Sequence, residues 1–258
     1  MPKFNANLSM MFNEVPFLER FGAAAKAGFK GVEFLFPYDF TPAQVREQLD
    51  RHHLEMVLFN MPPGDFAAGD RGTACDPARF GEFQDGVGKA LEYAKVLGVK
   101  QLHVMAGLKP RGLNDETMRE AYLASLRFAC AETAKHGIKV LIEAINTRDI
   151  PGFYLNTSAQ ALDVMHYVGA ANLGFQYDIY HMQIMEGDLA PTIEKHLAKI
   201  AHMQLADTPG RHEPGTGEIN YDFLFRHIDR IGYQGWIGCE YRPAGKTEDG
   251  LGWMKPWL

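Results

Sequence analysis

The chain has 258 residues, of which 46% are hydrophobic and 22% charged, a composition typical of a folded protein with a large core. Its formal net charge of −6 argues against the basic surface that nucleic-acid binding requires, so small molecules are the favoured partners. No apolar stretch is long enough to cross a membrane, no secretory leader is recognisable, and the three cysteines lack paired spacing. We therefore expect a cytoplasmic protein with reduced thiols.

Short apolar runs rich in Val, Ile, Leu and Phe alternate along the chain with segments of helical periodicity. The expected strands are residues 4–8, 31–36, 55–60, 101–106, 139–145, 173–178, 200–206 and 236–241. The expected helices are residues 15–27, 42–52, 80–97, 115–136, 158–168, 189–199 and 221–231. About eight strands alternating with helices predict a closed (β/α)₈ barrel, a TIM barrel of the α/β class, as a single domain over residues 1–258.

An open, doubly wound sheet is the alternative fold, but no Gly-x-Gly-x-x-Gly pattern follows the first expected strand. Most expected helices end at a glycine that can adopt a left-handed C-cap, among them Gly28, Gly98, Gly137 and Gly232. Two long polar loops, residues 62–79 and 207–220, follow the third and seventh strands. In a barrel both loops lie on the carboxyl face, where active sites assemble.

Polar residues stand at the ends of four consecutive expected strands: Glu143, Asp178, Gln204 and Glu240. Any one of these carboxylates taken alone is equally well explained as a solvated or salt-bridged strand end. Taken together they converge on one point of a barrel, where three carboxylates repel one another unless a cation neutralises them. An all-oxygen set of three carboxylates and one amide suits Mg²⁺ or Mn²⁺ better than Zn²⁺.

The sequence closely resembles the hydroxypyruvate isomerase family, which belongs to the xylose-isomerase-like barrel superfamily. The likeness covers nearly the whole chain and lies in FNANLSMMFNEVPFLERF, GVEFLFPY, GDFAAGDRG, LIEAIN, YDIYHMQIMEG, HEPGTGEINYDFLF and YQGWIGCEYRP. It implies an isomerase of small hydroxy-oxo acids that interconverts hydroxypyruvate and tartronate semialdehyde. A close second reaction is the interconversion of 2-oxo-tetronate and 3-oxo-tetronate, and the terminal motifs look particularly like enzymes of that kind.

By this resemblance Glu143 and Glu240 are the acid and base residues, and they bind a divalent metal together with Asp178 and Gln204. The related epimerases have His where Gln204 stands here. An amide is a weaker ligand than an imidazole, so an absolute requirement for the metal stays open.

By analogy with the same epimerases, His181 and Arg211 are candidates to bind the substrate carboxylate, and Arg71 is a further one. Arginine can grip a carboxylate through two parallel hydrogen bonds. The alternatives are a solvated loop arginine at Arg211 and a helix cap at His181.

Three other functions compete with this assignment. A ketose 3-epimerase would use the same two glutamates on opposite faces of one carbon. An apurinic-site endonuclease of this superfamily needs a His-rich multi-metal cluster and a basic surface, which the acidic chain does not suggest. A barrel that binds a metabolite without turnover is the third. Barrels of this family often form homo-oligomers, for which the aromatic carboxyl-terminal segment offers a surface.

Overall fold

A closed barrel of eight parallel strands forms the centre of the computed structural model, which describes residues 1–257. The strands pair in chain order, and β1 pairs with β8 to close the ring. They are β1 (Lys3–Asn7), β2 (Gly31–Phe34), β3 (Glu55–Asn60), β4 (Gln101–His103), β5 (Lys139–Glu143), β6 (Leu173–Asp178), β7 (Ile200–Leu205) and β8 (Trp236–Cys239). The predicted (β/α)₈ barrel is confirmed.

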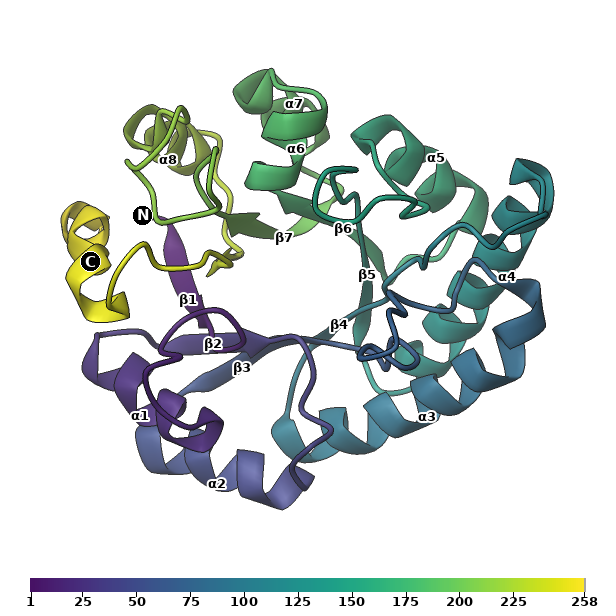
Figure 1. Cartoon of the computed structure of the whole chain (residues 1–258), viewed down its shortest axis with the longest axis horizontal. Helices are drawn as coiled ribbons and strands as arrows, with labels where there is room; N and C mark the ends of the chain where they lie inside the picture. The colour runs from purple at the N-terminus through teal and green to yellow at the C-terminus, as the bar shows by residue number, and fades with distance from the viewer. Residues whose placement is uncertain (258) are drawn as a thin grey trace.

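Helices form an outer ring around the strands, as Figure 1 shows. They are α1 (Phe17–Lys26), α2 (Pro42–His52), α3 (Phe80–Leu97), α4 (Asp115–Ala134), α5 (Ser158–Val168), α6 (Ile179–Met185), α7 (Leu189–His196) and α8 (Tyr221–Arg230), with the 3₁₀ segments η1 (Pro77–Arg79) and η2 (Thr247–Trp257). Helix α6 is missing from the sequence prediction, because it begins directly after β6 with no loop to mark its start. None of the described helices is both long and apolar enough to cross a membrane.

Most element boundaries agree with the sequence, and those of α2, α3, α5, β3 and β6 coincide with it. The main disagreement is at the carboxyl ends of strands, where β4 ends at His103 and β8 at Cys239, before the apolar runs themselves end. These runs continue because the segments stay buried after they leave the sheet, so hydrophobicity alone cannot mark where pairing stops. The glycines expected to cap helices all have positive φ: Gly28, Gly98, Gly137 and Gly232.

Segment η2 follows β8 in the chain and lies on the outside of the barrel (Figure 1). Trp253 and Trp257 pack against Phe225 of α8, with ring centroids 5.7 and 5.4 Å apart respectively. Trp253 also makes an edge contact with Phe4 of β1, at 5.0 Å. The aromatic residues of this segment therefore cover the seam at which the first and last strands meet.

The two long polar loops lie at the carboxyl face, as predicted, and both contribute to the same cavity. In the loop of residues 207–220, the buried carboxylate of Asp207 accepts hydrogen bonds from the backbone N–H groups of Gly215, Gly217 and Ile219. One charged side chain thus satisfies several donors and fixes the path of the loop.

A buried carboxylate, Glu33 of β2, lies inside the barrel below the carboxyl face. Its oxygens accept hydrogen bonds from Asn5 Nδ2 at 2.8 Å, Asn7 Nδ2 at 3.1 Å, His202 Nε2 at 2.7 Å and Gln204 Nε2 at 2.8 Å. Burial alone raises the pKa of a carboxyl group, but His202 and the amide donors hold the pKa of Glu33 below its ordinary value. This part of the barrel interior is therefore a polar network and not an apolar plug.

Gly238 of β8 leaves the space that the Glu33 carboxylate occupies, since a Cβ at this position would overlap both carboxylate oxygens. We expect Gly238→Ala to lower the free energy of unfolding by about 1–3 kcal/mol, because the added methyl group must displace a fully hydrogen-bonded buried charge. Denaturant unfolding followed by circular dichroism measures the change.

Gly88→Ala is the matched control, because Gly88 lies in α3 and, beyond the local backbone of that helix and its chain neighbours, no described atom lies within 4 Å of the added Cβ. This change should raise stability by about 0.5–1 kcal/mol through the helix preference of alanine. Equal effects of the two substitutions would contradict the steric argument at Gly238.

Candidate active site

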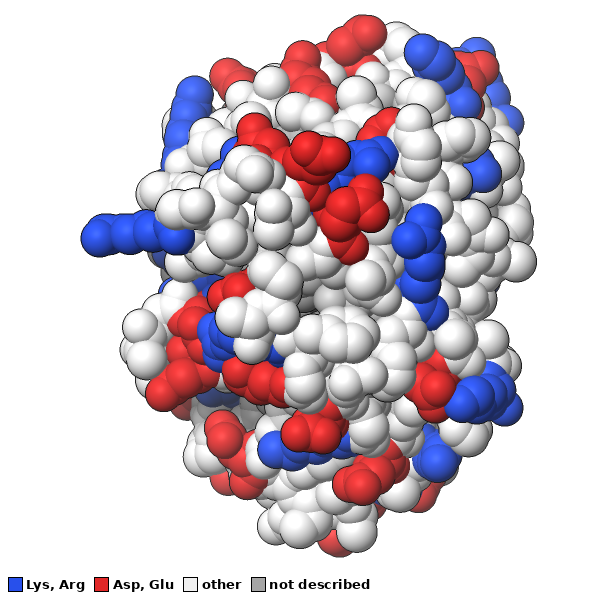
Figure 2. Space-filling view, turned by 90° about the vertical axis from the view of Figure 1, so that its right-hand side faces the viewer, with Lys and Arg blue, Asp and Glu red and all other residues white. Residues whose placement is uncertain are grey.

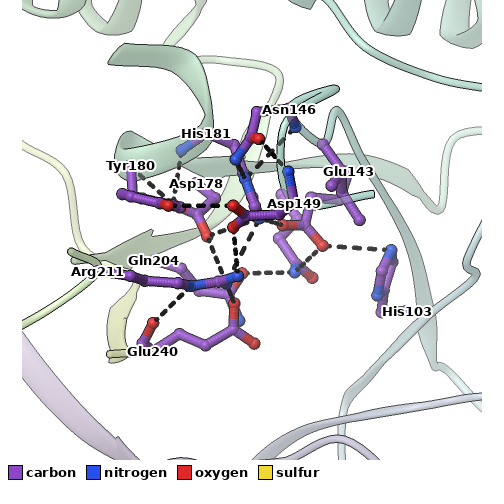
Figure 3. Close-up of polar contacts among 12 residues, drawn as sticks. His103, Glu143, Asn146, Asp149, Asp178, Tyr180, His181, Gln204, Arg211 and Glu240 are labelled. Atoms are coloured by element: carbon purple, nitrogen blue, oxygen red, sulfur yellow. Dashed lines mark hydrogen bonds and ion pairs between the residues drawn. The ribbon is translucent and has the colours of Figure 1, made fainter. Parts of the chain in front are cut away.

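Four polar side chains from neighbouring strands meet at the carboxyl end of the barrel (Figure 3). Glu143 ends β5, Asp178 ends β6, and Glu240 directly follows β8. Gln204 lies on β7 in register with Asp178. All four are buried, because the carboxyl ends of parallel strands converge toward the barrel axis. The structure thus brings together the residues that the sequence suggests as metal ligands.

A cavity of about 440 Å³ opens over this cluster, and Glu143 and Glu240 form part of its lining. His181, Arg211 and Arg71, the three candidates for binding a substrate carboxylate, line the same cavity. The catalytic and substrate-binding candidates therefore face one common space, which is the geometry that a small-molecule site requires.

Arg211 lies among the carboxylates and is not a solvated loop residue. Its guanidinium is 2.7 Å from Glu240 Oε2, 3.1 Å from Asp149 Oδ2 and 3.8 Å from Asp178 Oδ2. The backbone of Arg211 has a φ of 58°, a left-handed conformation that costs a non-glycine residue free energy. In this conformation the loop of residues 207–220 places the positive charge of Arg211 between the carboxylates.

His181 presents a hydrogen-bond donor to the site. Its Nδ1 lies 2.6 Å from Asn146 Nδ2 and 3.4 Å from the Asn146 backbone nitrogen, which is a donor. Arg211 Nη2, also a donor, lies 3.4 Å from Nε2, but the Asn146 amide is the closer donor and makes Nδ1 the acceptor. The neutral ring therefore carries its proton on Nε2, which is 3.6 Å from both Glu143 Oε1 and Asp178 Oδ2. Burial, with the charge of Arg211, lowers the pKa of His181 well below its ordinary value, so the ring is neutral.

Gln204 is oriented by its two neighbours. Its Nε2 donates to Glu33, so its amide oxygen faces the carboxylate cluster, where it accepts from Gln176 Nε2 at 2.7 Å. Gln176 also donates to Glu143 Oε2 at 3.0 Å and so connects the two. The amide oxygen of Gln204 retains a second lone pair on the side of the cluster.

His103, at the end of β4, lines the same cavity. It presents a hydrogen-bond acceptor, whereas His181 presents a donor. Its Nδ1 lies 3.1 Å from Asn60 Oδ1, an acceptor, so the neutral ring carries its proton on Nδ1. Burial and the neighbouring His202 lower the pKa of His103 to about 3. Its Nε2 is buried, has no hydrogen-bond partner among the described residues, and is 3.7 Å from Glu143 Oε2.

The carboxyl groups of the cluster have raised pKa values. Burial raises the pKa of Glu143 well above its ordinary value, and the charges of Glu240 and Asp178 add to this effect. Burial also raises the pKa of Glu240, to about 8, although Arg211 opposes the rise. Burial likewise raises the pKa of Asp178. One arginine does not compensate for three buried carboxylates, so the cluster favours protons or a further cation.

The donor set fits a hard divalent cation. Carboxylate oxygens of Glu143, Asp178 and Glu240, one from each residue, lie within 4.8 Å of one another. Asp178 Oδ2 and Glu143 Oε1 are buried and have no hydrogen-bond partner among residues 1–257. Such orphaned carboxylate oxygens beside an amide oxygen are the ligands that Mg²⁺ and Mn²⁺ prefer.

Several residues of the site escaped the sequence analysis or were given no role in it. Glu33 and His103 lie on expected strands but have no role among the sequence predictions. Gln176, Asn146 and Arg242 were missed, although Gln176 could be found from its spacing, since it precedes Asp178 by two residues and so shares its face of the strand. Asn146 and Arg242 lie in irregular segments after strands, where no periodic signal exists.

Comparisons with known proteins agree with this geometry. Residues 21–257 match the family described as xylose isomerase-like TIM barrel. A 2-oxo-tetronate isomerase from Cupriavidus necator is 52% identical over 258 residues, which cover 100% of this chain and 99% of that protein. The hydroxypyruvate isomerase of Escherichia coli is 50% identical over 257 residues, with 100% of both proteins covered.

Among solved structures, that of a protein described as an AP endonuclease of family 2 from Brucella melitensis has a TM-score of 0.98 and 50% sequence identity. The match covers 100% of this chain and 99% of that chain. The chain therefore belongs to the xylose isomerase-like TIM barrel family and is an isomerase related to hydroxypyruvate isomerase and 2-oxo-tetronate isomerase.

Proposed function

We propose that the chain interconverts hydroxypyruvate and tartronate semialdehyde by proton transfer at Glu143 and Glu240 beside a divalent metal. The observation that carries this proposal is the pair of buried glutamates with raised pKa values on one cavity. A carboxylate that removes a carbon-bound proton works best when its pKa is raised toward the working pH. The names of two relatives at 52% and 50% identity support the substrate class, a small hydroxy-oxo acid.

The reaction moves one proton between adjacent carbons, through an enediolate, and another between their oxygens. One of the two glutamates removes the carbon-bound proton, and the same or the other glutamate returns a proton to the neighbouring carbon. Glu143 is suited to this task because it lines the cavity that a substrate would enter. Glu240 is positioned by Asn7 Nδ2 at 3.1 Å and by Arg211 at 2.7 Å. His181 Nε2–H can donate to the negative charge that develops on the substrate.

Glu143, Asp178, Gln204 and Glu240 are the residues that would hold the metal, Mg²⁺ or Mn²⁺. A divalent ion bound there supplies electrostatic stabilisation of negative charge on the substrate oxygens. The tautomer of His181 supports Gln204 as the fourth ligand, because an Nε2 that carries a proton cannot donate a lone pair. Glu33 holds the Gln204 oxygen toward the cluster.

The substrate carboxylate requires a positive partner on the cavity wall. Arg211 and His181 lie beside the cluster, while Arg71 stacks on the Phe66 ring at 3.9 Å and has no carboxylate within ion-pair distance among the described residues. We propose Arg211, His181 and Arg71 as the substrate-binding residues. The charge of Arg71, unlike that of Arg211, is not paired with a carboxylate among the described residues.

The second candidate reaction is the isomerisation of 2-oxo-tetronate to 3-oxo-tetronate. The 52% identical relative from Cupriavidus necator carries this name, and a cavity of about 440 Å³ accommodates four carbons as readily as three. The chemistry at Glu143 and Glu240 is the same for both acids, so chain length alone separates the two reactions.

The endonuclease alternative has less support from the surface. On the face shown in Figure 2, Asp and Glu side chains lie among the Lys and Arg side chains, and the chain as a whole has a formal net charge of −6. A surface of this kind offers little of the phosphate neutralisation on which DNA binding depends.

Incubation in D₂O with hydroxypyruvate or 2-oxo-tetronate, in the presence of Mg²⁺ or Mn²⁺, tests the proposal by NMR. We expect a product with a shifted carbonyl and deuterium on carbon from at least one acid. Glu143→Gln and Glu240→Gln should each lower kcat by about 10²–10⁴-fold, because an amide cannot transfer the proton.

Glu47→Gln is the control, because Glu47 is exposed on α2 and pairs with Arg51, far from the cavity lining. Undiminished turnover in both active-site variants would contradict the assignment of the glutamates. Epimerisation of a free ketose without reaction of either acid would show that the substrate class is wrong.

Metal binding distinguishes Gln204 from His181 as the fourth ligand. We expect Gln204→Leu to weaken Mn²⁺ binding by at least about tenfold, and His181→Gln to change it by less than about threefold, as measured by calorimetry. Gln234→Leu, on an exposed loop, controls for the loss of an amide. The reverse order of the two effects would assign the fourth position to His181.

The raised pKa values predict how stability depends on pH in the metal-free protein. Glu240 titrates near its ordinary value of 4.5 when unfolded and at about 8 when folded, so the folded state binds the proton more tightly. The contribution of Glu240 to stability is therefore full below about pH 4.5 and is lost as the pH rises toward 8, with a Tm decrease of about 2–4 °C per kcal/mol.

Added Mg²⁺ should reduce this loss, because the metal takes the place of the proton, and its stabilising effect should grow with pH. Differential scanning calorimetry with EDTA or with Mg²⁺ measures both slopes. A Tm that falls from pH 5 to pH 8 in EDTA to the same extent in the wild type and in Glu240→Gln would contradict the role of this carboxyl group.

A further inference from the structure

We infer that His103 accepts a hydrogen bond from the substrate hydroxyl group and makes the site selective for hydroxy acids over their deoxy analogues. The inference rests on the proposed function and adds to it the residue that recognises the hydroxyl. The proposed mechanism does not otherwise use the His103 side chain.

His103 is built into the cavity wall. It is the last residue of β4, is 1% exposed, and lines the same cavity as Glu143 and His181. Its Nε2 atom has no hydrogen-bond partner among the described residues, although a buried polar nitrogen costs free energy when it stays unpaired. Because His103 lines the cavity, a hydroxyl group that enters there can supply the partner.

The tautomer of the ring decides which partner fits. Asn60 Oδ1 accepts a hydrogen bond from His103 Nδ1–H at 3.1 Å, so the buried Nε2 carries a lone pair on the side of Glu143. A lone pair accepts from a hydroxyl group and repels a carboxylate or a carbonyl oxygen. Among the groups of a hydroxy-oxo acid, only the hydroxyl is a donor.

The position of His103 agrees with the chemistry. Its Nε2 is 3.7 Å from Glu143 Oε2, too far for a direct hydrogen bond. Figure 3 marks this contact with a dashed line. A hydroxyl group held at Nε2 brings its carbon, and the hydrogen on that carbon, to the side of the Glu143 carboxylate. His181, which presents an N–H donor, and His103, which presents an acceptor, therefore recognise different oxygens of one substrate.

Ligand pairs that differ by one hydroxyl test this inference. We would measure the binding of hydroxypyruvate and of pyruvate, which lacks the hydroxyl, by calorimetry to the Mg²⁺-loaded protein. His103→Leu should weaken hydroxypyruvate binding by about tenfold and leave pyruvate binding nearly unchanged. His103→Gln keeps an amide acceptor near the position of Nε2 and should restore most of the affinity for hydroxypyruvate.

His166→Leu is the control for the loss of an imidazole, because His166 is exposed on α5. Equal loss of both ligands in His103→Leu would show that His103 only supports the fold of the site. Such a result would overturn the inference even if the wild type isomerises hydroxypyruvate.

The tautomer itself has an independent readout. In ¹⁵N-labelled protein, long-range proton–nitrogen NMR correlations should show His103 protonated at Nδ1 and His181 protonated at Nε2, with the His103 signals assigned from the His103→Gln variant. Protonation of His103 at Nε2 would overturn the inference. If no hydroxy-oxo acid is turned over while the hydroxyl-dependent binding persists, the proposed reaction fails and the role of His103 stands.

Discussion

The mutual repulsion of three buried carboxylates is the constraint on which the rest of this end of the barrel depends. Glu143, Asp178 and Glu240 lie together away from water, where like charges are costly and their protonated forms are favoured. Arg211 provides one compensating charge, and a left-handed backbone at that residue places it there. The polar side chains around them serve to orient the carboxylates, or to leave particular oxygens without a partner.

Two neutral histidines line the cavity, and one presents a hydrogen-bond donor while the other presents an acceptor. A backbone N–H fixes His181 as a donor, and an amide oxygen fixes His103 as an acceptor. Neither ring needs a charge, because the partner on its far side decides its tautomer. The outer partners of the site, Asn146 and Asn60, thereby determine which groups of a small ligand the cavity can recognise.

The sequence alone predicts the barrel and the four strand-end residues, since both depend on patterns that repeat at fixed intervals. It also contains a further signal for the site: polar residues two apart on β1, β6 and β7, such as Gln176 and Asp178, share one face of a strand. The position of Arg211 could not be derived in this way, because it depends on the conformation of an irregular loop. The unpaired nitrogen of His103 likewise results from contacts across strands that no local pattern encodes.

Closure of the ring has a consequence for the order in which the protein folds. Residues 3–6 of β1 pair with residues 236–239 of β8, and Glu240 follows that last strand directly. During synthesis the edges of β1 and β7 therefore stay open until the final strand emerges, and exposed edges of this kind promote association between chains. Because Glu240 arrives with the strand that removes both edges, the carboxylate cluster is completed in the same step, and no partly closed barrel contains it.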